Sequence, residues 1–269
     1  MAIQIKTLDQ LKLMRRAGLV VGQTLELLKQ SIKPGMTTSA LDSIAAAHIK
    51  RGGATSNFLN YHGFPAVICV SVNDEIVHGI PGPRIINEGD IVSIDCGAII
   101  DGWHGDAAVS IGVGEINPED QKLMDVCQES MWRGIAAGKN GAKLSDIGYA
   151  IEQYTNSQGK YGILREYGGH GIVTEMHQEP HVLNFGKAGQ GPEIIPGLVL
   201  AIEPMITRGS GRTKVLGDDW TVVSIDGSRG AHFEHSYCIA PDGKPFVLTA
   251  IDGGKDQLGR LGIVISDLL

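Results

Sequence analysis

Long apolar segments and basic residues are both scarce in this chain of 269 residues. No stretch reaches the roughly 18 unbroken apolar residues that a transmembrane helix needs. The first residues, MAIQIKTLDQLKLMRR, lack the apolar core and cleavage site of a secretory signal peptide. With 23 basic against 30 acidic residues, the net charge is −7, which excludes capture of nucleic acid by the charge of the whole molecule. We therefore expect a cytoplasmic protein that binds neither a membrane nor DNA.

Cysteines and aromatic residues are also few. The cysteines form no C-x-x-C pair, so neither a zinc finger nor a thioredoxin-like redox site is indicated; they are Cys69, Cys96, Cys127 and Cys238. In a reducing cytoplasm, we expect them to be buried thiols. Glycine is in excess, with 37 residues or about 14%, twice the usual ~7%. Together with nine histidines and the acidic excess, this composition directs the search to an enzyme that handles metals or anions.

Apolar periodicity and turn residues predict four helices and six strands. Helices are expected over 7–31, 39–51, 145–158 and from Pro118 onward, with Thr7 or Asp9 capping the first and Asn117 the third. Runs rich in β-branched residues predict strands over 66–72, 90–100, 107–113, 197–204, 220–225 and 235–240. Two helices followed by strands occur twice, which predicts an α+β fold rather than a doubly wound sheet.

A weak internal repeat accompanies this order. The segment 35–42 resembles 141–148 at an offset of 106 residues, and 89–95 resembles 197–203 at an offset of 108. We interpret the chain as a single domain, 1–269, with pseudo-symmetric halves of about 1–116 and 117–269. The alternative is that short glycine-bounded strands simply look alike. If the fold is symmetric and places equivalent strands side by side, Asp95 and Glu203 face each other across its middle.

Five carboxylates and imidazoles lie in or beside glycine-bounded strands: Asp95, Asp106, His170, Glu203 and Glu234. A strand, a turn and a return strand fit between Asp95 and Asp106, so a hairpin brings these two acids together. An acid in an apolar strand is costly unless it is paired or ligated. Four carboxylates and one histidine suit two divalent cations, whereas a single zinc site usually shows more His or Cys ligands.

These five residues resemble the metal centre of the pita-bread metallopeptidases. The surrounding sequence resembles the type I methionine aminopeptidases over nearly the whole chain, through the motifs YHGFP, SVNDEIVHGIP, DGWHGD, EYGGHGI, HQEPH, PGLVLAIEPM and FEHS. The resemblance implies a pita-bread fold, in which two pseudo-symmetric halves share a central antiparallel sheet covered by helices. It also implies a metalloaminopeptidase that removes the initiator methionine from nascent proteins and peptides, with a preference for a small second residue.

The resemblance assigns a role to each of the five. Asp106 and Glu234 are similar to the ligands that bridge two metal ions, and Asp95 to the carboxylate that completes one of them. His170 and Glu203 are similar to those that complete the other, with Glu203 also acting as general acid and base. The two ions are expected to be cobalt, manganese, iron or zinc, which this donor set does not distinguish.

The resemblance also implies residues that contact the substrate. His78 resembles the histidine that hydrogen-bonds the substrate amide nitrogen, and His177 the one that stabilises the tetrahedral oxyanion. Met176 and Phe58 depart from the residues common in the family. Gly97 does so too, at a position that often carries threonine. The positions that match the family's methionine pocket are Phe58, Tyr61, Phe64, Cys69, Met176 and Trp220.

Other histidines and one basic cluster are left with open interpretations. His62 is expected to be a wall residue of the site, whereas His48, His181, His232 and His235 are expected to be structural. Arg208, Arg212 and Lys214 lie in the segment TRGSGRTK, which is interpreted either as a solvated hairpin tip or as a contact with ribosomal RNA.

Two rival functions stay open from the sequence. One is another pita-bread peptidase, an X-Pro aminopeptidase or prolidase, although these carry a long N-terminal domain. The other is a non-catalytic pita-bread protein that binds partners or RNA, which is expected to have lost metal ligands. The family resemblance also implies a monomer.

Overall fold

The computed structural model describes residues 3–269, and its helices begin and end where their capping residues predict. The first helix, α1 (Leu8–Ser31), starts after Thr7, whose side chain accepts a hydrogen bond from the Gln10 amide in a capping box. Asn117 caps α3 (Pro118–Ala137), which has proline at its first position. The predicted α2 and α4 are also present, over Thr38–Arg51 and Leu144–Gln158. A short fifth helix, α5 (Lys255–Arg260), was not predicted.

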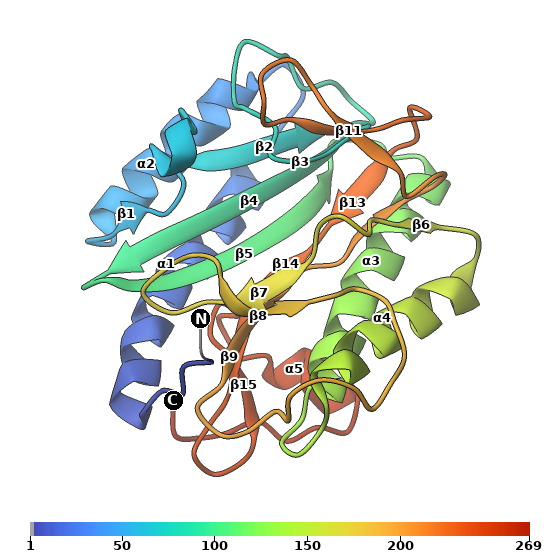
Figure 1. The fold of residues 1–269 in the computed structure, drawn as a ribbon. Coiled ribbons are helices and arrows are strands. Elements are labelled where there is room, and N and C mark those ends of the chain that lie inside the picture. Colours follow the sequence, from blue (N-terminus) through green and yellow to red (C-terminus); the bar gives the residue numbers. More distant parts are fainter. Residues whose placement is uncertain (1–2) are drawn as a thin grey trace.

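A nine-stranded antiparallel sheet forms the centre of the molecule (Figure 1). Its strands run in the order β1-β4-β5-β14-β9-β7-β8, while β2 pairs with β4 and β15 with β14. Their bounds are β1 Thr55–Ser56, β2 Ile68–Val72, β4 Ile91–Ile100, β5 Trp103–Gly112, β7 Gly169–Gly171, β8 Gln178–Val182, β9 Val199–Ile202, β14 Glu234–Ile239 and β15 Pro245–Val247.

Two three-stranded sheets accompany the main one. The order β13-β10-β6 joins Gly230–His232, Met205–Thr207 and Gly162–Ile163, and the order β11-β12-β3 joins Thr213–Val215, Val222–Ser224 and Glu75–Val77. Sequence patterns predicted only the longer or more apolar strands. Most strands of two or three residues are too short to show an alternation of apolar and polar residues, so their local sequence carries little signal.

The prediction that the strands of Asp95 and Glu203 lie side by side was wrong. β4, which carries Asp95, and β9, which precedes Glu203, are not neighbours, because β5 and β14 lie between them. The strands that meet at the middle are β5 and β14, and these carry Asp106 and Glu234. β5 pairs with β4 in a hairpin, so it is β5 that lies between β4 and the strands of the second half.

The hairpin that joins β4 to β5 is tighter than predicted. β5 begins at Trp103, four residues before the expected start, because the turn consists only of Asp101 and Gly102. Both turn residues have left-handed backbone, with φ of 51° and 82°, as two-residue hairpins of this kind require. Gly105 therefore lies inside the strand rather than in the turn.

The helices cover one face of the sheet and leave the other free. α1 packs against β4 and β5, where Val21 and Leu25 join a core that includes Ile94, Cys96 and Ala107. On the other half, α3 contributes to a second core that includes Leu200, Ile202 and Tyr237. Figure 1 shows α1 and α2 on the side of β4 and β5, with α3 and α4 on the side of β14. The four cysteines are buried free thiols, as expected.

Within residues 3–269, no helix has the length and apolar character to cross a membrane.

The close approach of α1 to β5 gives a first prediction. A methyl group on Gly105 would lie 2.8 Å from the backbone nitrogen of Gly18 and 2.9 Å from its Cα. Backbone atoms cannot give way as a flexible side chain does, so Gly105→Ala should destabilise the fold by about 1–3 kcal/mol. That corresponds to roughly 2–4 °C in Tm for each kcal/mol, measured by calorimetry.

The matched control is Gly217→Ala. Nothing lies within 4 Å of the added methyl group there, and the backbone φ is not left-handed. Its free energy of unfolding should change by no more than about 0.5 kcal/mol. Equal stability of the two variants would contradict the tight packing of α1 on β5.

Candidate metal centre

Strand register directs three of the predicted ligands to one face of the sheet. Asp95 on β4 and Glu234 on β14 both pair with Ala108 of β5, and Asp106 lies two residues before Ala108. Side chains alternate between faces along a strand, and paired residues share a face. Asp95, Asp106 and Glu234 therefore point to the same side, opposite the helices.

The other two predicted ligands reach the same face from the second half. His170 of β7 pairs with Ala201 of β9, and Ala201 pairs with Ser236, two residues after Glu234. Glu203 lies two residues after Ala201. The even spacing along each strand thus brings both side chains to the face that carries Glu234.

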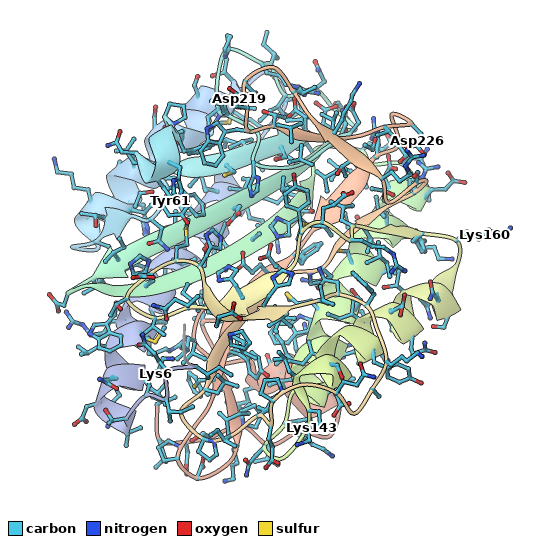
Figure 2. The ribbon with its side chains drawn as sticks, viewed as in Figure 1. Lys6, Tyr61, Lys143, Lys160, Asp219 and Asp226 are labelled. Atoms are coloured by element: carbon cyan, nitrogen blue, oxygen red, sulfur yellow. The ribbon has the colours of Figure 1, made fainter. Side chains whose placement is uncertain are left out.

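This face opens into a cavity of about 450 Å³. All thirteen residues singled out from the sequence line it: Phe58, Tyr61, Phe64, Cys69, His78, Asp95, Asp106, His170, Met176, His177, Glu203, Trp220 and Glu234. Figure 2 labels Tyr61, which lies on the short 3₁₀ turn between β1 and β2, and shows Lys143, Lys160 and Asp226 at the periphery. Residues from both halves of the chain therefore share one cavity.

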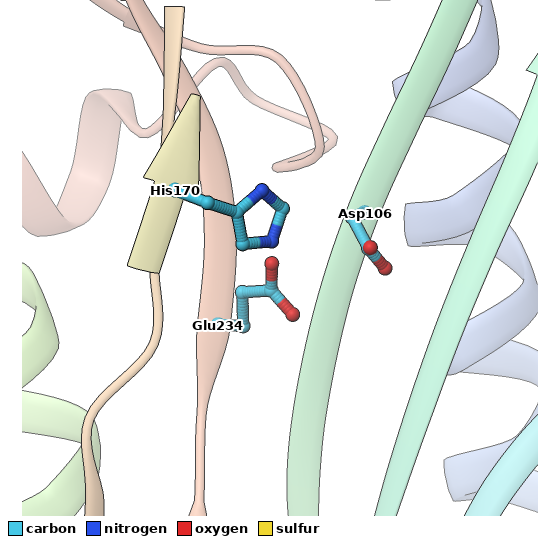
Figure 3. A group of neighbouring side chains, drawn as sticks. All are labelled: Asp106, His170 and Glu234. Carbon is cyan, nitrogen blue, oxygen red and sulfur yellow. The ribbon is translucent and has the colours of Figure 1, made fainter. Parts of the chain in front are cut away.

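Three of the ligand-type side chains lie close together. Donor atoms of Asp106, His170 and Glu234 are all within 4.8 Å of one another, and the three side chains are buried. Figure 3 shows His170 from β7 and Glu234 from β14 extending toward β5, which carries Asp106. A second group, equally compact, consists of Glu203, His232 and Glu234. Asp95 belongs to neither group, although it lines the same cavity.

The acids of this cluster are electrostatically strained without a cation. Burial raises the pKa of Asp95 to about 7 and that of Glu203 to about 8. Burial, followed by repulsion from neighbouring carboxylates, also raises the pKa of Asp106 and Glu234 well above the usual range. One carboxylate oxygen each of Asp95, Asp106 and Glu234 is buried without a hydrogen-bond partner. Divalent cations would supply the missing partner and offset the charge, so the donor set fits metal binding.

His170 has the form that a metal ligand needs. Burial lowers its pKa to about 3, which keeps the imidazole neutral, and its Nδ1 lies 3.0 Å from the carbonyl oxygen of Gly171. Donation from Nδ1 to this carbonyl leaves the lone pair on Nε2, which lies 3.6 Å from Oε1 of Glu203.

His78 and His177 both line the cavity. His78 follows β3 with a left-handed φ of 61°, packs edge-on against the rings of Tyr167 and Trp220, and has a pKa lowered to about 4, mainly by burial. The Nδ1 of His177 lies 2.9 Å from the hydroxyl of Tyr61, and its ring is 4.4 Å from that of His170. Burial lowers the pKa of His177 as well, so both imidazoles are neutral near pH 7.

The remaining predicted residues form the apolar end of the cavity. Phe58, Phe64, Cys69 and Met176 are buried in one cluster, and Tyr61 and Trp220 pack against it. The rings of Phe64 and Trp220 meet edge to face at 5.0 Å. This end offers an unbranched apolar side chain a polarisable wall.

The other histidines lie in different surroundings. His232, expected to be structural, is buried beside Glu203, with its Nε2 3.5 Å from Oε2. His181, also expected to be structural, lines the cavity, whereas His62 is exposed and is not among the lining residues. His235 contacts the Thr249 hydroxyl at 2.8 Å on the far side of β14, as a structural residue does. His48 likewise contacts Thr24, at 2.9 Å.

Sequence reasoning also missed lining residues. Glu166 and Tyr167 were quoted only as part of the EYGGHGI motif, and Met205 only as part of PGLVLAIEPM, yet all three line the cavity. Their position inside motifs of the family was the signal that could have identified them.

Gly97, where the family often has threonine, has no room for a side chain. A Cβ at this position would lie 2.6 Å from the side-chain nitrogen Nδ2 of Asn57.

Comparisons with known proteins agree with this site. The chain matches the model of Metallopeptidase family M24 over residues 12–241. It is 47% identical to methionine aminopeptidase 1 of Bacillus subtilis over 238 residues, covering 88% of this chain and 96% of that protein. It is 46% identical to the methionine aminopeptidase of Clostridium perfringens over 249 residues, covering 93% and 99%. It superposes on the crystal structure of the methionine aminopeptidase from Thermotoga maritima with a TM-score of 0.90 at 38% identity, covering 93% and 100%.

The chain therefore belongs to metallopeptidase family M24, and its fold is the pita-bread fold. Within that family, the relatives place it among the methionine aminopeptidases rather than the X-Pro aminopeptidases. The predicted fold class and enzyme class are both confirmed.

The raised pKa values of the cluster predict how the metal-free protein responds to pH. Between about pH 6.5 and 8, the folded state holds protons on these acids that the unfolded chain, with carboxyl pKa values near 4, has already released. The free energy of unfolding should therefore fall as the pH rises through this window. The buried histidines oppose this trend in the lower part of the window, because unfolded imidazoles, with pKa values near 6.5, still hold protons there that the folded state does not. The fall is therefore expected above about pH 7.4, where unfolded imidazoles have lost most of their protons.

Calorimetry of chelator-treated protein at pH 7.4, 7.7 and 8 measures this effect. Tm should decrease along the series, and Glu203→Gln should weaken the decrease because it removes one titrating acid. With excess divalent metal the trend should reverse, because ligation requires deprotonated carboxylates. A metal-free Tm that is constant or increases from pH 7.4 to 8 would contradict the strained acid cluster.

Proposed function

We propose that this chain, as a methionine aminopeptidase, hydrolyses the bond after an N-terminal methionine with two divalent ions held by Asp95, Asp106, His170, Glu203 and Glu234. The observation that supports this assignment most strongly is that these side chains converge on one cavity whose buried carboxylate oxygens lack partners. When bound, the ion pair supplies a water of lowered pKa and electrophilic stabilisation of the carbonyl oxygen. The identity of the metal among cobalt, manganese, iron and zinc stays open.

Glu203 is proposed to carry the proton of the reaction. It takes a proton from the attacking water and returns it to the amide nitrogen of the leaving peptide. In the metal-free site burial raises the pKa of Glu203 to about 8, so the surroundings of this carboxyl group favour its taking up a proton between the two steps. Its position between His170 and His232 keeps the carboxylate at the polar end of the cavity.

Two neutral imidazoles are proposed to act on the substrate. His78 hydrogen-bonds the amide nitrogen of the scissile bond, and His177 donates to the carbonyl oxygen as negative charge develops there. The Tyr61 hydroxyl lies 2.9 Å from Nδ1 of His177. If Tyr61 donates to Nδ1, the proton of His177 is left on Nε2, where it can be directed at the substrate.

The apolar end of the cavity is proposed to bind the methionine side chain. Phe58, Phe64, Cys69 and Met176 offer soft, polarisable surface that suits a thioether. Tyr61 and His177, joined by their hydrogen bond, lie on the wall above this end, so we also propose that the second residue of the substrate must be small.

The partners are proposed to be nascent polypeptide N-termini in the cytoplasm, bound by a monomer. Of the three basic residues predicted for a ribosome contact, one is already engaged within the protein. Arg208 forms ion pairs with Glu119 and with the buried Asp120. Arg212 and Lys214 are exposed, so they are the residues left for such a contact.

A peptide assay tests the proposed reaction. Met-Ala-Ser and an Ala-Pro peptide are incubated with metal-loaded protein, and the products are followed by mass spectrometry. Only Met-Ala-Ser should lose its first residue, and a chelator should abolish the loss because the bound ions supply the nucleophile. Cleavage of the proline peptide alone would favour an X-Pro peptidase, and cleavage of neither peptide would favour a binding protein.

Replacement of His78 tests its proposed contact with the substrate. His78→Ala should reduce kcat/KM by on the order of 10²-fold, the scale of one lost hydrogen-bond donor in the transition state. Metal content, measured by mass spectrometry of the elements, should stay at the wild-type value. Loss of metal from this variant would show that His78 is a ligand instead.

His78→Asn serves as the control for the strained backbone. Asparagine tolerates the left-handed φ of 61° at this position and keeps an N–H donor. Its melting temperature should match that of the wild type within a few degrees, so that any loss of activity in the alanine variant is separated from unfolding.

A further inference from the structure

His232 is a buried histidine at the metal centre that the proposed reaction does not use. Its exposed fraction is 1%, and its Nε2 is buried without a hydrogen-bond partner. A buried polar group in this state costs about 1–3 kcal/mol, so an interaction that satisfies the nitrogen is expected when the site is complete. Oε2 of Glu203 lies 3.5 Å from this nitrogen.

The backbone of His232 is fixed independently of this contact. On β13, His232 pairs with Met205 of β10, two residues after Glu203. The Ser110 hydroxyl accepts from the amide of His232 at 2.8 Å and donates to its carbonyl at 2.9 Å. The backbone position of His232 is therefore fixed by β5 and β10 rather than by Glu203.

Glu203 consequently lies between two imidazoles. Its Oε1 is 3.6 Å from Nε2 of His170, and its Oε2 is 3.5 Å from Nε2 of His232. His170 lines the cavity, whereas His232 is not among the lining residues. The two oxygens of Glu203 thus face different surroundings, one toward the cavity and one toward the protein interior.

We propose that His232 is a positioning residue that donates its Nε2 hydrogen to Oε2 of Glu203 and so directs Oε1 toward the metal site. A hydrogen bond to the outer oxygen of a ligating carboxylate fixes its orientation and changes metal affinity by about 10–100-fold in known sites. This inference rests on the proposed role of Glu203 as a metal ligand.

Cobalt titration of metal-free protein tests the inference. Isothermal calorimetry gives the Kd of each of two cobalt equivalents, and the visible absorption bands of cobalt(II) report the coordination. His232→Leu, which keeps the volume but removes the donor, should weaken one equivalent by about 10–100-fold and leave the other unchanged. His232→Gln, which restores an N–H donor, should recover most of the lost affinity.

The matched control is His235→Gln. His235 is also a buried histidine next to Glu234, but it contacts Thr249 on the other side of the strand. Its cobalt affinities and spectrum should equal those of the wild type. Thermal unfolding of every variant shows whether a change in affinity follows from loss of fold.

Two outcomes overturn the positioning role. If His232→Leu binds only one cobalt at saturation, His232 is itself a ligand in the group with Glu203 and Glu234. If His232→Leu retains both wild-type affinities, His232 is only a core residue. A wild-type protein that binds no cobalt, or binds it without cleaving Met-Ala-Ser, would instead show a failure of the proposed function.

Discussion

The removal from water of four neighbouring carboxylates on one face of a sheet is the constraint on which this molecule depends. The pKa values of Asp95, Asp106, Glu203 and Glu234 are all raised, and several of their oxygens have no hydrogen-bond partner. Hydrophobic burial elsewhere has to offset the cost of holding these acids together. Divalent cations bound at this site would relieve both the charge and the missing partners.

The scaffold meets this constraint by separating the two faces of its sheet. Apolar residues that alternate with the acids, such as Ile94 and Cys96 beside Asp95 and Ile202 beside Glu203, pack under the helices. The glycines allow close approach where a side chain would intervene, as at Gly105 under α1. The rigid layer of helices on one side therefore fixes the positions of the ligands on the other.

The cavity, like the sheet, separates apolar residues from charged ones. Its apolar end is built from the cluster around Phe64 and Met176, and its charged end from the acids and His170. His78 and His177 stand between the two ends with pKa values lowered by burial. Neutral imidazoles at this position can donate hydrogen bonds without adding positive charge that would compete with the metal ions.

The sequence by itself determined the long helices, the two longest strands and the residue types of the metal site. Capping residues such as Thr7 and Asn117 act locally, and the resemblance to a known family named thirteen of the residues that line the cavity. Tertiary structure alone decided which strands meet at the middle, since β5 and β14 are separated by more than 120 residues in the chain. It also decided the place of His232, which a sequence pattern could not distinguish from a core histidine. Its position beside Glu203 depends on pairing between β13 and β10, a contact that no local pattern encodes.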